Sequence, residues 1–199
     1  DIVTGSVRWQ GLGVINPFAD DGSLVPLAQY PRLRAYLDVR RAMIARRHVA
    51  QKAPASWYRT IDRITPSLTW EPKLLIPDIK GEAHVVYEEG KLYPHHNLYF
   101  VTSETWDLKV LQMILSSRVA HAFIAAYSPR LRGNFLRFQA QYLRRIRIPR
   151  FENLSKSLQK ETLAAARSSH QGEKDALVQR LYNLTDLDWS RLDPSILTA

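Results

Sequence analysis

The sequence predicts an α+β fold: a mixed β-sheet with a long buried helix and a helical C-terminal tail. Three observations support this prediction. Short apolar runs separated by proline and glycine occupy residues 73–102, a pattern typical of strands. Residues 105–127 carry Leu and Ala at helical spacing with few charges, which indicates a buried helix. Two amphipathic stretches follow residue 150.

Length and composition describe an ordinary globular domain. The chain has 199 residues, of which 45% are apolar and 24% charged. The absence of Cys excludes disulfides, thiolate nucleophiles and Cys-based zinc sites. No apolar run approaches the roughly 18 residues that a membrane helix needs. We therefore expect a protein without a membrane partner, located in the cytoplasm.

The opening of the chain is rich in glycine and proline. It has neither an initiating Met nor a signal peptide, and residues 1–30 have the composition of loops and short strands. We expect the chain to be a piece of a longer protein and residues 1–30 to be a linker that leaves an upstream domain.

A helix is predicted over residues 31–52. Pro31 suits its first turn, and Pro54 stops it. Its apolar face would include Leu33, Tyr36, Leu37, Ile44 and His48.

The middle of the chain predicts a sheet and then the long helix. Residues 73–76 form a strand ended by Pro77, and residues 97–102 form another. Residues 85–87 and 91–93 would pair as a hairpin around a turn at 88–90. The helix over 105–127 follows, and residues 146–149 read as an edge strand. Two tail helices, at 153–168 and 173–183, would be separated by Gly172.

The positive charge is concentrated in two segments. Overall, 28 Lys and Arg face 19 Asp and Glu, which leaves a net charge of +9. Residues 31–59 hold eight basic residues and the single acid Asp38, and residues 128–151 hold seven Arg and no acid. Arginine binds phosphate and the guanine edge with two hydrogen bonds. Nucleic acid is the partner that this pattern favours, although a solvated basic surface is the alternative.

The second basic segment also carries side-chain amides. Arg132, Asn134, Arg137 and Gln139 combine the chemistry that reads guanine edges with the chemistry that reads adenine edges. Gly133 would allow the backbone to approach DNA closely. These residues are therefore the candidates for reading bases, with phosphate contact as the alternative role for each Arg.

A catalytic site is harder to find. No two His stand four residues apart, and no glycine loop for phosphate is present. The pattern of Asp78, Glu89 and Lys91 matches a loose signature of magnesium-dependent nucleases, in which two carboxylates hold the metal beside a lysine. The competing interpretation is that Glu89 simply forms part of the hairpin turn.

Several short motifs together resemble one known family. The motifs are residues 57–59 (Trp-Tyr-Arg), 72–79 (Pro-Lys-Leu-Leu-Ile-Pro-Asp-Ile), 94–100 (Pro-His-His-Asn-Leu-Tyr-Phe), 111–117, 132–138, 142–143, 146–149 and 177–185. In this order they resemble the C-terminal specificity domain of TaqI-type adenine DNA methyltransferases. The resemblance covers residues 57–150 and 177–187.

The resemblance implies a DNA target recognition domain of a restriction–modification methyltransferase, over residues 31–150, followed by a helical tail over 151–199. It implies that the fragment is not an enzyme by itself and holds no cofactor, and that an upstream domain of the same chain holds S-adenosylmethionine and the flipped adenine. Double-stranded DNA would be the partner. The residues expected to contact it are Arg59, Lys80, His95, Asn97, Arg130, Arg132, Asn134, Arg137, Gln139 and Arg144. A stand-alone magnesium nuclease using Asp78, Glu89 and Lys91 is the alternative, and an RNA-binding module is a third.

Overall fold

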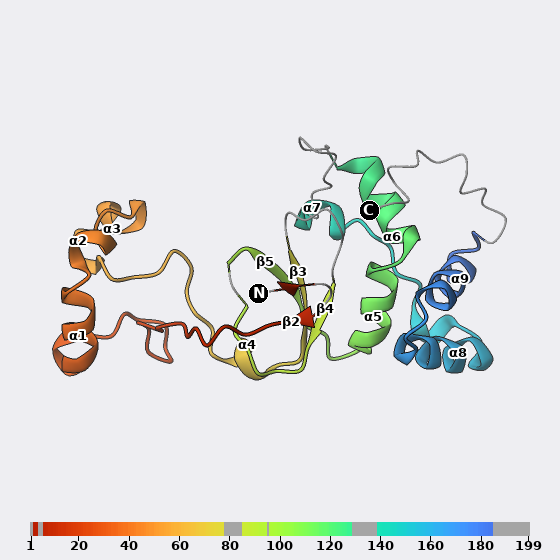
Figure 1. Cartoon of the computed structure of the whole chain (residues 1–199), viewed down its shortest axis with the longest axis horizontal. Helices are drawn as coiled ribbons and strands as arrows, with labels where there is room; N and C mark the ends of the chain where they lie inside the picture. Colours follow the sequence, from red (N-terminus) through yellow and green to blue (C-terminus); the bar gives the residue numbers. More distant parts are fainter. Residues whose placement is uncertain (1, 4–5, 78–84, 95, 129–138, 185–199) are drawn as a thin grey trace. The chain divides into compact units, whose positions relative to one another are not determined.

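The chain forms two compact units, each described here by itself. The structure is a computed structural model that describes residues 2–3, 6–77, 85–94, 96–128 and 139–184 (Figure 1). Unit 1 contains residues 1–10 and 67–199, and unit 2 contains residues 11–66. Helices and a small sheet make up the described residues, which confirms the α+β prediction.

Unit 2 is helical. Its elements are η1 (Leu27–Gln29), α1 (Pro31–Asp38), α2 (Arg41–Ile44), α3 (His48–Lys52) and η2 (Pro54–Ser56). The single helix predicted over 31–52 is therefore wrong, because the backbone leaves helical geometry at Arg40 and becomes extended at Arg47. These breaks fold the segment around Trp57, whose buried ring packs with Leu37 and Ala50. Of the predicted apolar face, Leu33, Leu37 and Ile44 contribute to the core of the unit, whereas Tyr36 and His48 are exposed, so the prediction is wrong for these two.

The sheet of unit 1 has β3 at its centre. β3 (Lys73–Pro77) pairs antiparallel with β4 (Val86–Glu88) on one side and with β5 (Leu98–Val101) on the other. Every described pair is antiparallel, so the expectation of a mixed sheet is wrong. The predicted hairpin is also wrong, since residues 91–93 form no strand and β4 pairs with β3 instead.

Different elements pack on the two faces of this sheet. Leu74 and Ile76 point to the face that packs on the helices, in a cluster with Leu111 and Ile124. Leu75 points to the opposite face and packs with residues of β1 (Ile2–Val3) and β2 (Ser6–Val7), a two-stranded antiparallel ribbon. Because side chains alternate along a strand, the continuous apolar run of β3 indicates burial on both faces.

Two helices replace the single one predicted over 105–127. They are α5 (Leu108–Leu115) and α6 (Arg118–Tyr127), with an angle of 58° between them. Ser117 breaks the run, because its buried hydroxyl accepts a hydrogen bond from Ala120 N and starts a new helix. The expected burial is confirmed for α5, which packs on β3 and β4 on one side and on α8 and α9 on the other. Among the described residues, no single helix is long and apolar enough to cross a membrane.

The start of α5 is held by a carboxylate. Asp107 caps the helix by accepting hydrogen bonds from Lys109 N and Val110 N, and its other oxygen pairs with Arg167 at 2.7 Å. Burial by itself would raise the pKa of Asp107, but the hydrogen bonds from Arg167 and the backbone outweigh it and lower the pKa. One acid therefore fixes the central helix to the last turn of α8.

The remaining elements are α4 (Ser67–Trp70), α7 (Ala140–Leu143), η3 (Phe151–Asn153), α8 (Lys156–Arg167) and α9 (Gln171–Leu181). The two tail helices are confirmed, but Gly172 lies inside α9, and the break between the helices falls at residues 168–170. Residues 146–149 are not a strand. Ile146 and Ile148 instead anchor an extended segment against the helical core, while Arg147 between them stays exposed.

Candidate nucleic-acid interface

Four of the ten residues expected to contact DNA lie in the described part of the chain. They are Arg59 in unit 2 and Asn97, Gln139 and Arg144 in unit 1. The other six lie outside the described residues: Lys80, His95, Arg130, Arg132, Asn134 and Arg137. Asp78 of the nuclease pattern also lies outside them.

Arg59 is held inside unit 2. Its residue is half-buried, and its backbone carbonyl accepts a hydrogen bond from Arg47 Nη2 at 3.0 Å. Its Nε is buried, and no described residue accepts a hydrogen bond from that atom. Arg59 is thus the least accessible of the basic residues that the sequence offered in this segment, together with Arg47.

The three described candidates of unit 1 differ in exposure. Asn97 is exposed and directly precedes β5. Gln139 is half-buried before α7, and its Oε1 accepts a hydrogen bond from Gln141 Nε2 at 3.0 Å. Arg144 is exposed at the C-terminal end of α7.

Arg144 belongs to an arginine-lined groove. Arg144, Arg145 and Arg147 line it together with apolar residues of α6, including Phe123 and Tyr127, around a volume of about 800 Å³. The Arg145 guanidinium lies 5.5 Å from the centre of the Tyr127 ring. Cations beside apolar and aromatic side chains suit a phosphate backbone with its bases or sugars.

Tyr182 fixes the position of this arginine segment. Its hydroxyl donates a hydrogen bond to the Arg147 carbonyl at 2.8 Å. Burial raises the pKa of Tyr182 to about 12, so the phenol stays protonated and remains a donor at neutral pH.

Unit 2 exposes most of its cations. Arg34 pairs with Asp38 at 3.4 Å, and the guanidinium of Arg40 stacks on the Tyr36 ring. The exposed cations of α1–α3 and their junctions are Arg32, Arg34, Arg40, Arg41, Arg46 and Lys52. Of the basic residues in this segment, only Arg59 was expected from the sequence to contact DNA. Helical spacing alone would not have found them all, since Arg40 and Arg41 stand three or four residues from Leu37 and Ile44 and are nevertheless exposed.

Arg47 has a structural role instead. Its Nε donates to the Ile44 carbonyl at 3.1 Å, and its Nη2 donates to the carbonyls of Trp57 and Arg59 at 3.2 and 3.0 Å. One guanidinium therefore ties the end of α2 to the segment after η2. Its hydrogen bonds are used within the unit, and we do not count it among the DNA contacts.

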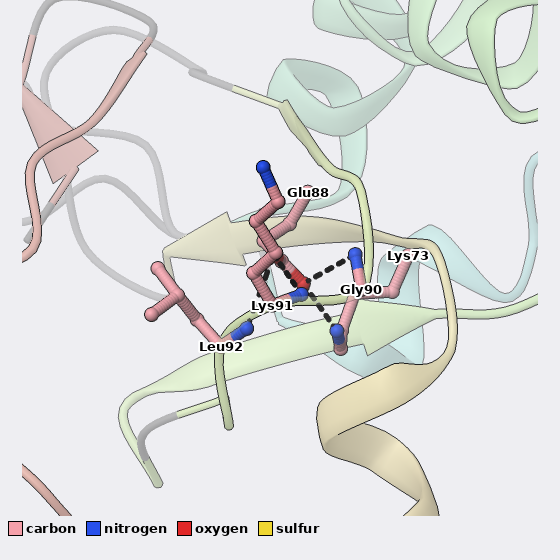
Figure 2. A network of polar contacts seen from close by, with 5 residues as sticks. All are labelled: Lys73, Glu88, Gly90, Lys91 and Leu92. Carbon is pink, nitrogen blue, oxygen red and sulfur yellow. Dashed lines mark hydrogen bonds and ion pairs between the residues drawn. The ribbon is translucent and has the colours of Figure 1, made fainter.

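In unit 1, a buried ion pair organises the chain after β4. Lys73 and Glu88 are opposite each other in the β3–β4 register, and their side chains form a salt bridge that is almost completely shielded from water (Figure 2). The Glu88 carboxylate also accepts hydrogen bonds from the backbone N–H groups of Gly90, Lys91 and Leu92 at 3.1, 2.7 and 3.1 Å. The acid thus supplies the acceptors for the turn that leaves the sheet.

The ionisation of Glu88 depends on these contacts. Burial would raise the pKa of Glu88, but the hydrogen bond from Lys73, the backbone N–H groups and the Lys73 charge together lower it. Gly90 completes the turn at a positive φ of 94°, where a Cβ would collide with the Trp70 carbonyl.

The nuclease pattern gains no support from this geometry. Glu89 and Lys91 are exposed and pair with each other at 2.6 Å. Glu88, the neighbouring acid, is neutralised inside the sheet. In the part of the chain that the structure describes, no group of three His, Asp or Glu could hold a metal ion.

Comparison with known proteins identifies the family. Residues 34–148, more than half of the chain, match the TaqI-like C-terminal specificity domain. The chain belongs to this family. The match confirms the resemblance and extends it toward the N-terminus, so that the specificity domain includes most of the basic helices of unit 2 as well as the sheet and the arginine-lined groove.

Three curated relatives are Type II methyltransferases. The chain is 59% identical over 192 residues to M.PaeR7I of Pseudomonas aeruginosa, 54% over 188 to M.XhoI of Xanthomonas vasicola and 45% over 186 to M.BstVI of Geobacillus stearothermophilus. These alignments cover 93–96% of this chain but 33–34% of each relative. The chain therefore spans about a third of the length of the curated relatives it matches.

We predict that the buried ion pair is costly to break on one side. Glu88→Leu leaves the Lys73 ammonium buried without its partner and should lower the free energy of unfolding by about 3–5 kcal/mol. The double change Lys73→Met/Glu88→Leu removes both charges and should cost clearly less. Urea unfolding checks both variants, with Glu89→Leu as the control, since losing the exposed pair should cost less than about 1 kcal/mol. Equal losses for Glu88→Leu and Glu89→Leu would contradict the role of the pair.

A second prediction separates two adjacent arginines. Arg47→Ala removes the donor shared by three backbone carbonyls and should destabilise unit 2 by about 2–4 kcal/mol. Arg46→Ala changes an exposed side chain and should stay within about 0.5 kcal/mol of the wild type. Hydrogen exchange of the backbone amides of residues 31–59 measures the difference, and similar protection in both variants would refute the assignment.

Proposed function

We propose that this specificity domain is the DNA target recognition module of an adenine-specific DNA methyltransferase in a restriction–modification system. The observation that carries the proposal is the pattern of the comparisons. A match to the specificity-domain family coincides with high identity to Type II methyltransferases over almost all of this chain and only a third of theirs.

The proposal divides the work between two parts of one longer chain. The remaining two thirds, by analogy with the relatives, would hold S-adenosylmethionine and perform methyl transfer in the cytoplasm. The part described here would bind double-stranded DNA and hold it while the target base is flipped. By this division the fragment alone transfers no methyl group, and the DNA-binding region is residues 31–150, with residues 151–199 as a helical tail.

Within the module, the basic residues would have two kinds of role. Exposed arginines such as Arg144 would bind phosphates, because a phosphate contact needs only charge and reach. Arg132, Asn134 and Arg137 would read base edges. Asn97 would contribute from the start of β5. No observation favours the nuclease.

The first test is the dependence of DNA binding on salt. Several arginines that contact phosphates together release the counterions of the duplex, so the affinity should fall steeply as the salt concentration rises. Fluorescence anisotropy with a labelled duplex at low and at physiological ionic strength measures this dependence. An affinity that does not respond to salt would argue against the phosphate contacts.

The second test concerns sequence reading by Arg137. In the full-length protein, Arg137→Ala should cost about 1–3 kcal/mol of binding on the cognate site and much less on random DNA, because a base contact acts only where its base is present. Lys156→Ala, which removes an exposed cation from α8, is the matched control and should leave the ratio of the two affinities unchanged. If Arg137→Ala weakens both substrates equally, Arg137 is a phosphate contact.

A further inference from the structure

Helices α1 and α2 present a second apolar face in addition to the one that forms the core. Residues 32, 36, 39 and 43 follow helical spacing on a side away from Leu33, Leu37 and Ile44, and Arg40 borders this side because its guanidinium stacks on the Tyr36 ring. Turn hydrogen bonds link α1 and α2 although the backbone leaves helical geometry at Arg40: Arg40 N donates to the Leu37 carbonyl at 2.9 Å, and Ile44 N donates to the Arg40 carbonyl at 3.0 Å. We call the side chains of Arg32, Tyr36, Val39, Arg40 and Met43 the outer face.

The outer face exposes apolar groups to an unusual extent. Val39 is 83% exposed, Met43 68% and Tyr36 46%. Three large apolar side chains on one short helical surface form a patch that is typical of a binding surface. The core of unit 2 does not use them, because Leu37, Ala50 and Trp57 fill it from the other side.

One cation of the outer face is held in place. The Arg40 guanidinium lies 3.8 Å from the centre of the Tyr36 ring, and its Nη1 donates to the Tyr36 carbonyl at 3.0 Å. The stack fixes the direction of the guanidinium and leaves donors over for a partner, since an arginine carries five N–H groups. A positioned cation beside apolar groups binds with less loss of side-chain entropy than a freely rotating one.

The charge of unit 2 points to an anionic partner. Its 56 residues hold nine Lys and Arg against four Asp. The resulting net charge of +5 is more than half of the +9 of the whole chain. The only acid of α1, Asp38, pairs with Arg34. The outer face itself contains two cations and no acid.

We propose that the outer face binds the minor groove of duplex DNA, an inference that rests on the proposed function and adds a contact surface to it. Val39 and Met43 lie against the sugar and base edges of the groove, and Arg32 and Arg40 bind the phosphates on its two sides. Minor-groove proteins combine arginines with apolar wedges such as Met in this way. The positive charge favours this partner over the surface of another protein domain.

The experiment that tests the apolar part changes no charge. Anisotropy of the full-length protein with an A·T-rich duplex should show about a tenfold lower affinity for Val39→Ala/Met43→Ala, with the salt dependence unchanged. Ile61→Ala/Trp70→Ala is the matched control, because it removes two exposed apolar side chains elsewhere and should bind like the wild type. The proposal would be overturned if both double variants bound DNA as tightly as the wild type. It would also be overturned if both lost the same amount of affinity.

A second pair of double variants tests the two cations of the outer face, Arg32 and Arg40. Arg32→Ala/Arg40→Ala should lower the slope of affinity against salt by about two phosphate contacts, while Lys156→Ala/Lys160→Ala on α8 should leave it unchanged. Circular dichroism of every variant checks that the helices are retained.

A measurement on the wild type needs no variant. Netropsin, a ligand that occupies the minor groove, should compete with the protein for the A·T-rich duplex. Unimpaired binding in its presence would overturn the inference and leave DNA binding as such intact. Variants of the outer face that bind DNA normally but lose methyl transfer would instead assign this face to the rest of the chain. If the wild type does not bind the duplex at all, the proposed function fails and the inference fails with it.

Discussion

A carboxylate that is cut off from water has to be neutralised, and in unit 1 this requirement determines how the sheet is built. Glu88 ends β4 directly opposite Lys73, the first residue of β3, so their salt bridge ties β4 to β3. The same carboxylate accepts three N–H groups of the residues that follow. Residues 90–92 are therefore committed to Glu88 and cannot return as a second hairpin strand. β5 takes the other edge of β3 and runs parallel to β4.

The charged residues fall into two groups according to what they contact. Lys73, Glu88, Asp107 and Arg47 are used by the fold, where they join strands, start a helix or collect backbone carbonyls. Most of the arginines in α1–α3 and residues 144–150 are exposed. Net charge alone does not separate these groups. Burial and hydrogen-bond partners do, and they move Arg47 into the structural group even though it stands in the most basic part of the sequence.

Sequence reasoning succeeded where hydrophobic periodicity decides the structure. The apolar run of β3, the burial of α5 and the two tail helices follow from spacing alone, and so does the face of Leu33, Leu37 and Ile44. It failed where a single polar group overrides that spacing. Ser117 starts a new helix inside an apolar stretch, and Glu88 turns inward from a position that reads as an exposed turn. In the candidate site, the two charged segments were visible, but spacing did not distinguish the exposed Arg40 from the half-buried Arg59, because their exposure depends on the break at Arg40 and on the packing of the segment after η2.

The division into two units has a consequence for how such domains diversify. Unit 2 has its own core around Trp57, and among the described residues the hydrophobic clusters of unit 1 contain none from unit 2. A substitution that repacks one core therefore requires no compensating change in the other. Residues on the surface of one unit can therefore change in evolution independently of residues on the other unit. Between members of this family, the surface of one unit can in this way change while the core of the other is inherited unchanged.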